Sequence, residues 1–162
     1  MIRFTLALFA FSAAATLLPA AEPSFAPATI KTAAELAATV KQNLAKNPDQ
    51  ADAPVVNTDR YRINVVRRGK EGVAMAHATG LAKGTEVHYI IDGAATVVTG
   101  GTLVRTEGGP NGRGVTSIQG GETRHVAKGD VVVIPAGTPH WYKEVEGSVT
   151  YLEVRFDVDP KK

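Results

Sequence analysis

Residues 129–140 read Gly-Asp-Val-Val-Val-Ile-Pro-Ala-Gly-Thr-Pro-His, and this stretch is the most informative part of the chain. The β-branched run 131–134 predicts a short buried strand, which Pro135 ends because proline cannot donate to a sheet ladder. Residues 135–139 predict a tight turn in which Gly137 takes a positive φ. His140 then begins the next strand, so its imidazole has the fixed position that a metal ligand or a catalytic base requires.

Apolar and polar residues alternate with a period of two from Tyr61 onward, which is the pattern of half-buried β-strands. A tight hairpin turn is expected at Asp92-Gly93. Short strands separated by glycine turns predict an all-β sandwich or barrel. The expected strands are 61–65, 73–77, 86–91, 94–99, 102–106, 115–118, 124–127, 131–134, 140–145 and 148–156.

One helix is predicted before the strands. Thr32 and Glu35 have the spacing of a capping box, in which each side chain satisfies a free backbone amide at a helix start. Apolar residues then recur at helical spacing, so we expect a helix over residues 33–46. Residues 47–59 contain two prolines and are expected to form a linker.

The composition excludes several classes of protein. With 162 residues, 44% of them hydrophobic, the chain can build one domain with a core. The formal net charge is only +2, so no strongly basic surface is implied and nucleic acid is not expected as a partner. The absence of cysteine rules out disulfides, thiolate metal ligands and a cysteine nucleophile.

The N-terminus has the pattern of a secretory signal peptide. Arg3 precedes an uncharged apolar run over residues 4–18, and small residues follow it at Ala20 and Ala21. The alternative is a membrane anchor, but the run is shorter than the roughly 20 residues that span a bilayer. We therefore expect a signal peptide at 1–21, a leader with the helix at 22–54 and the β domain at 55–158. The mature protein is expected in the periplasm or outside the cell, with no membrane attachment.

Two parts of the sequence resemble the cupin superfamily. Gly129, Pro135, Gly137 and His140 match the second cupin signature. In the first signature, Glu86 and Gly93 match the second half, whereas the two histidines that usually precede the Glu are missing from residues 79–82. The resemblance implies a small single-domain cupin, that is, a jelly-roll β-barrel with one N-terminal α-helix. It also implies a homodimer.

The missing pair of histidines has two candidate replacements. His88 shares a strand face with Glu86, because side chains alternate, and the apolar Val73 and Met75 turn His77 toward the interior. We therefore predict that His77, Glu86, His88 and His140 converge on one metal ion. The alternative for Glu86 and His88 is a buried pair without a metal.

Imidazole and carboxylate ligands suit a divalent transition metal such as zinc, iron, manganese, nickel or copper. Tyr142 shares a face with His140 and is a candidate for lining the pocket, as is Met75. His125 belongs to no motif and is expected to lie outside the site.

The resemblance implies a metal-dependent enzyme that acts on a small oxygen-bearing molecule, with dioxygenase-like or isomerase-like chemistry. Two alternatives remain open. One is a non-catalytic module that binds a small ligand or a metal. The other is a metal-free isomerase or epimerase that uses histidine and tyrosine as acid and base.

Overall fold

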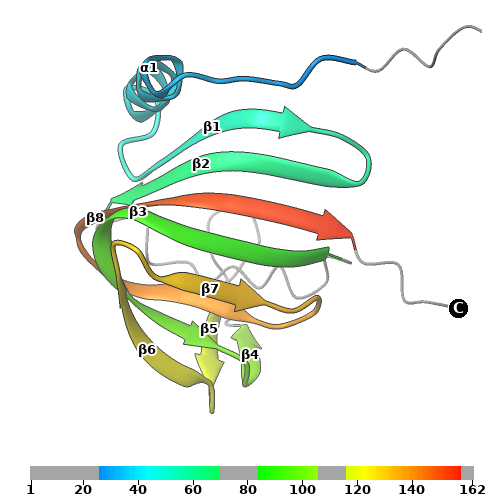
Figure 1. Ribbon diagram of the computed structural model, residues 1–162. Coiled ribbons are helices and arrows are strands. Elements are labelled where there is room, and N and C mark those ends of the chain that lie inside the picture. Colours follow the sequence, from blue (N-terminus) through cyan, green and yellow to red (C-terminus); the bar gives the residue numbers. More distant parts are fainter. Residues whose placement is uncertain (1–25, 70–83, 106–115, 158–162) are drawn as a thin grey trace, which may run out of the picture.

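The structure, a computed structural model, describes residues 26–69, 84–105 and 116–157 (Figure 1). The expected signal peptide, Met75 and His77 lie outside these described residues. Within the described ranges, no helix has both the length and the apolar character needed to cross a membrane. The elements are α1 (Ala33–Leu44), β1 (Gln50–Asn57), β2 (Tyr61–Gly69), β3 (Gly84–Thr99), β4 (Thr102–Arg105), β5 (Thr116–Gln119), β6 (Glu122–Ala127), β7 (Val131–Ile134) and β8 (His140–Asp157).

Helix α1 starts with the predicted capping box. The Thr32 hydroxyl accepts from the Glu35 N–H at 3.3 Å, and the Glu35 carboxylate accepts from the Thr32 N–H at 2.7 Å. The helix lies beside β1 (Figure 1), and the Asn43 side chain donates to the Asp52 carbonyl at 2.8 Å. The predicted helix is therefore confirmed, and its position covers one edge of the sheet.

Among the described strands every pairing is antiparallel, and the order of the strands in the sheet does not follow the sequence. The main sheet has the order β1-β2-β8-β3-β6, with β7 also paired to β3, while β4 and β5 form a separate two-stranded sheet. The last strand, β8, lies between β2 and β3 and pairs with both. This arrangement confirms the all-β jelly roll with one N-terminal helix.

The expected linker at residues 47–59 is wrong, because strand β1 lies there. β1 is an edge strand, where proline is tolerated because one side of the strand needs no ladder hydrogen bond. The register with β2 shifts between Pro54 and Val56, which marks a bulge next to the proline.

The expected hairpin at Asp92-Gly93 is also wrong. Strand β3 continues through both residues. It pairs with β8 both before and after them, and the register between the two strands shifts around residue 92. Gly93 has a φ of 78°, and a Cβ at this position would lie 2.0 Å from the Ser148 carbonyl oxygen. The glycine therefore allows a bulged bend against β8 rather than a chain reversal.

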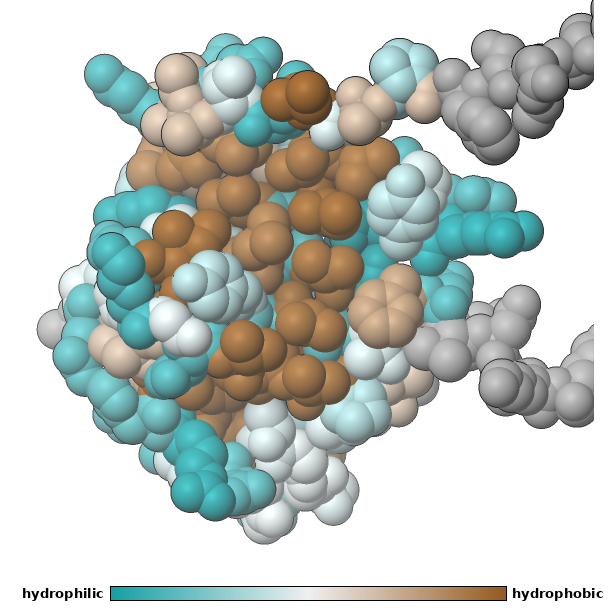
Figure 2. Space-filling view, viewed as in Figure 1, coloured by the Kyte–Doolittle hydropathy of each residue, from teal (hydrophilic) through white to brown (hydrophobic). Residues whose placement is uncertain are grey.

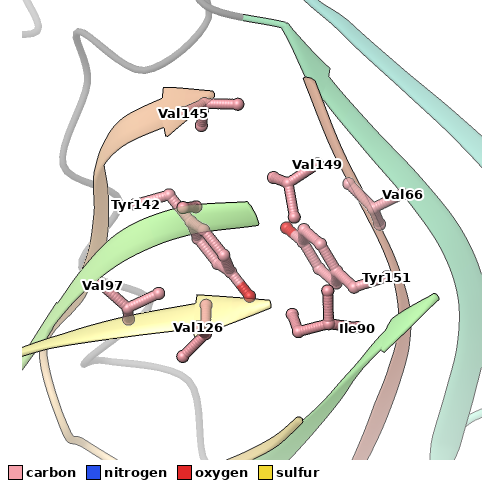
Figure 3. Close-up of a cluster of buried hydrophobic side chains, with 9 residues drawn as sticks. Val66, Ile90, Val97, Val126, Tyr142, Val145, Val149 and Tyr151 are labelled. Carbon is pink, nitrogen blue, oxygen red and sulfur yellow. The ribbon is translucent and has the colours of Figure 1, made fainter. Parts of the chain in front are cut away.

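The core lies on the inner side of this bent sheet (Figure 3). Two buried tyrosines are its largest members, and the rings of Tyr142 and Tyr151 stack with centroids 5.0 Å apart. Aliphatic side chains from β2, β3, β6 and β8 surround them. The cluster comprises Val66, Ile90, Ala95, Val97, Val126, Tyr142, Val145, Val149 and Tyr151.

The opposite side of the main sheet, here called the outer face, carries exposed apolar side chains. Figure 2 shows hydrophobic residues gathered across the middle of this side. The register places Tyr89 of β3 opposite both Val131 of β7 and Leu152 of β8, so the apolar residues form continuous rows. The most exposed members, at 36–61% of full accessibility, are Tyr61, Tyr89, Ile91, Val131, Val133 and Phe156.

Candidate metal site

The two long strands bring one carboxylate and two imidazoles together on the inner face. Glu86 and His88 are two residues apart on β3, so their side chains point to the same side. His140 begins β8, and its backbone pairs with Thr99 near the other end of β3. Because both strands bend at their bulges, His140 reaches Glu86 across the inner face.

The turn before β8 fixes the backbone of His140. Gly137 has a φ of 81°, as the sequence predicts. The Thr138 N–H donates to the Pro135 carbonyl at 3.0 Å, which closes the turn. The Gly100 N–H donates to the Pro139 carbonyl at 2.8 Å and ties the turn to the end of β3. Both backbone hydrogen bonds hold His140 in place before any ligand is bound.

The three side chains are buried and face one another at short distances. Oε2 of Glu86 lies 3.2 Å from Nε2 of His88 and 3.6 Å from Nε2 of His140. One ligand atom from each residue lies within 4.8 Å of the other two. Glu86, His88 and His140 are 3%, 1% and 7% exposed, so the group, here called the triad, is nearly closed to solvent.

The triad fits the requirements of a transition-metal site. Two ligand atoms that each lie about 2.1 Å from one metal ion are roughly 3.0–3.4 Å apart at octahedral or tetrahedral angles. The 3.2 and 3.6 Å separations are close to this range. Two histidines and one carboxylate without thiolate also form a ligand set that non-haem iron and zinc accept.

The remaining nitrogen of each imidazole has an oxygen partner. Nδ1 of His88 lies 3.0 Å from the Tyr142 hydroxyl, and Nδ1 of His140 lies 3.5 Å from the Thr138 carbonyl. A carbonyl can only accept, so the contact with Thr138 favours a proton on Nδ1 of His140 and a free lone pair on Nε2. Such outer partners commonly orient metal-binding imidazoles.

Electrostatics give Glu86 and His140 the protonation states that a metal requires. Burial would raise the pKa of Glu86, but the hydrogen bond with His88 and the nearby His140 and Arg155 outweigh it and lower the pKa to about 2. Burial lowers the pKa of His140 to about 4, against the opposing effect of the Glu86 charge. At neutral pH Glu86 is therefore a carboxylate and His140 a neutral imidazole.

Arg155 is a member of the site that the sequence analysis missed. Its guanidinium forms an ion pair with Oε1 of Glu86, which leaves Oε2 to face the imidazoles. The two residues are direct neighbours in the β8–β3 register. The sequence does indicate that Arg155 shares one face of β8 with Tyr151 and Glu153, because side chains alternate along a strand. It does not show that this face lies next to Glu86.

A polar cleft of about 160 Å³ opens beside the triad. Strands β1, β2, β3 and β8 each contribute side chains to it, and charged groups dominate. The lining residues are Gln50, Asp52, Arg62, Asn64, Val66, Arg68, Glu86, His140, Tyr151, Glu153 and Arg155.

The other residues considered in the sequence analysis do not belong to the triad or lie outside the described part of the chain. Tyr142 is 5% exposed and contacts His88 through its hydroxyl, so it supports the triad from the core side and does not line the cleft. Met75 and His77 lie outside the described residues. His125 is exposed, as expected, and its imidazole lies 3.1 Å from the Glu146 carboxylate.

Comparison with known protein families identifies the family of this chain. The family model described as Cupin matches residues 32–160. This chain is a cupin. Its match extends over the helix, every strand and all members of the triad.

Solved structures with the same fold are distant in sequence. The cupin resembles the TT1209 protein from Thermus thermophilus with a TM-score of 0.51 and 18% identity, covering 80% of this chain and 98% of the other. It resembles KdgF from Halomonas sp. with a TM-score of 0.50 and 18% identity, covering 70% and 84%. At such low identity these similarities establish the fold alone. No curated protein sequence matches this cupin.

Proposed function

We propose that this cupin binds one divalent transition metal through Glu86, His88 and His140 and is an enzyme acting on a small oxygen-bearing molecule. The observation that carries the proposal is the convergence of both Nε2 atoms on a single carboxylate oxygen, at 3.2 and 3.6 Å. Zinc, iron, manganese, nickel and copper all accept this set of ligands.

The chain's own residues would prepare this site before the metal arrives. Arg155 holds Oε1 of Glu86, so the carboxylate offers only its second oxygen to a metal. Tyr142 and the Thr138 carbonyl orient the imidazoles through Nδ1. A bound metal would supply Lewis-acid polarisation of a substrate oxygen or activation of dioxygen.

Burial of the triad would also favour polarisation of a substrate oxygen. The three side chains are largely buried, and a charge that develops on a substrate is stabilised more strongly in such surroundings than in water. The polar cleft beside the triad gives a small molecule access to it. Two-His-one-carboxylate ligation also leaves coordination positions for substrate.

A second candidate function is a non-catalytic cupin module that binds a small ligand or a metal. The ion pair between Arg155 and Glu86 favours it, because the buried carboxylate is already neutralised by a protein cation. In a metal-free form, Glu86 and His88 would remain a hydrogen-bonded pair at 3.2 Å. Metal content separates this form from the enzyme proposed above.

Elemental analysis of untagged protein, purified without added metal, tests the proposal. We expect about one transition-metal ion per chain in the wild type and little in His140→Ala, which removes one of three ligands. His125→Ala is the matched control, since its exposed imidazole lies outside the triad. Metal-free wild-type protein, or full metal content in His140→Ala, would contradict the proposed site.

We further propose that the protein is exported to the periplasm or secreted after removal of residues 1–21, and that it works as a homodimer. The basic residue, apolar run and small residues at the N-terminus support export. The intact mass of protein from its native host tests this, and a retained Met1 would contradict it. The exposed apolar outer face supports the homodimer.

A further inference from the structure

Three arginines line the cleft beside the triad, and two of them are paired with buried carboxylates. Arg155 forms an ion pair with Glu86. Arg62 pairs with Glu153 at 3.0 Å, and Glu153 is itself only 8% exposed. Both arginines therefore have a protein counter-charge, whereas the third, Arg68, has none within ion-pair distance among the described residues.

Arg68 has only neutral partners in the described part of the chain. Its Nε donates to the Tyr151 hydroxyl at 2.8 Å, and its Nη1 donates to the Gln50 side-chain oxygen at 2.9 Å. Its guanidinium carbon lies 5.9 Å from the centroid of the Tyr142 ring. No described acceptor bonds Nη2, so one edge of the guanidinium fork is left for a ligand.

No described neighbour forms an ion pair with Arg68. Burial raises the pKa of Tyr151 to about 12, and burial also raises the pKa of Tyr142, so both phenols are uncharged at neutral pH. Asp52 lines the same cleft, and its charge is one of the effects that raise the pKa of Arg68 against burial, but no ion pair joins the two side chains, and the Asp52 carboxylate accepts from the Gln50 amide at 3.4 Å. Arg68 therefore keeps its charge without a bonded counter-ion, and the Nη2 edge of its guanidinium can donate to a bound anion.

We propose that Arg68 binds the carboxylate of a small organic acid whose oxygen-bearing carbon lies at the Glu86–His88–His140 triad. The planar guanidinium fork matches the geometry of a carboxylate. Arg68, Glu86 and His140 line one cleft, so a single ligand can contact both the arginine and the triad. The role at the triad rests on the function proposed above, whereas carboxylate binding by Arg68 does not.

The size and charge of the cleft narrow the ligand class. Its volume of about 160 Å³ is enough for a ligand of roughly six non-hydrogen atoms, since a cavity of about 150 Å³ takes up benzene. The three arginines are balanced by three carboxylates in the lining, so a divalent metal would leave an excess of positive charge. The charge favours an organic acid over a neutral sugar or amide, and the volume is sufficient for a small monocarboxylic acid.

Ligand binding measured by calorimetry tests this proposal with defined probes. We expect glycolate, lactate and pyruvate to bind the wild-type protein, whereas the neutral amides glycolamide and lactamide bind at least about ten-fold more weakly, since they lack the charge-assisted hydrogen bonds. Equal binding of acids and amides, binding of inorganic phosphate in preference to the acids, or no binding of any acid would overturn it.

Variants locate the carboxylate. Arg68→Gln should weaken lactate binding about ten-fold or more, and Arg68→Lys should weaken it less because the charge remains. Arg67→Gln is the matched control, because residue 67 alternates to the other side of β2. If Arg68→Gln fails to fold, the proposal is tested instead by the lactate affinity of Arg68→Lys and by the difference between acid and amide binding in the wild type. Unchanged lactate affinity in a folded Arg68→Gln protein would overturn the proposal.

Repeating the titrations after chelation of metal separates this proposal from the function on which it rests. If the triad holds no metal, acids should still bind better than amides and still depend on Arg68, so carboxylate binding stands while the enzyme proposal fails. If metal is present but the acid–amide preference does not depend on Arg68, the arginine proposal fails alone.

Discussion

The two oxygens of the Glu86 carboxylate have different partners, and this division defines the site. Oε1 is held by Arg155, and Oε2 faces the imidazoles of His88 and His140. The sequence predicted three of these four residues, because Glu86 and His140 fall on cupin signature positions and strand alternation places His88 beside Glu86. Arg155 could not be predicted, since its contact depends on the register between strands 69 residues apart in sequence.

The shifted pKa values predict how stability depends on pH in metal-free protein. The pKa of His140 falls from about 6.5 to about 4 on folding, so the unfolded state binds more protons in this range and stability is lost as pH falls from 6.5 to 4. Glu86 adds a further loss between 4.5 and about 2. His140→Gln should remove up to roughly 3 kcal/mol of the first loss.

Chemical denaturation of chelator-treated protein across this pH range measures the effect. His125→Gln provides the control, because it removes a histidine that is exposed on β6. A slope between pH 6.5 and 4 that is the same in wild type and His140→Gln would show that His140 is not buried as a neutral imidazole.

At the scale of the elements, local chemistry predicted the helix and the turn before His140, but neither the length of the strands nor the path of the chain at Asp92-Gly93. The capping box at Thr32 and the positive φ of Gly137 are confirmed, because each depends on a few adjacent residues. Asp92-Gly93 has the sequence of a hairpin turn, yet β3 continues through it. Whether such a glycine reverses a strand or bulges it depends on the partner strand, here the Ser148 carbonyl beside Gly93.

The bulges have a functional consequence. They bend β3 and β8 so that the start of β3, with Glu86 and His88, faces the start of β8, with His140. A flat pair of strands would keep His140 beside Thr99, its partner at the opposite end of β3. The site therefore depends on a feature of the strands that the sequence pattern misrepresents as a turn.

For the whole molecule, the most telling feature is the outer face. Its exposed apolar residues, spread over four strands, are typical of a surface that another protein covers. We propose a second copy of the chain as its partner, because an apolar face can be complementary to itself across a two-fold axis. The buried strand expected at residues 131–134 is therefore wrong in its burial: its β-branched side chains resemble those of a core, but Val131 and Val133 are 58% and 61% exposed on this face.

A charge placed in this face should therefore break the proposed dimer. We expect wild-type protein to be a dimer in light scattering coupled to gel filtration, and Val133→Lys to weaken dimerisation about a hundred-fold or more, because two lysines would be buried in the apolar interface. Thr123→Lys, on exposed β6, is the control and should remain dimeric. A monomeric wild type, or a Val133→Lys protein as dimeric as wild type, would exclude this face as the interface.

The metal site is tested most directly by anomalous diffraction from crystals of the untagged protein, collected above and below the absorption edge of whichever metal elemental analysis finds. We predict one strong difference peak per chain, about 2.0–2.2 Å from Nε2 of His88, Nε2 of His140 and one carboxylate oxygen of Glu86. No peak at the triad in metal-containing crystals, or a peak only at an exposed pair such as His125 and Glu146, would contradict the assignment of Glu86, His88 and His140 as the metal ligands.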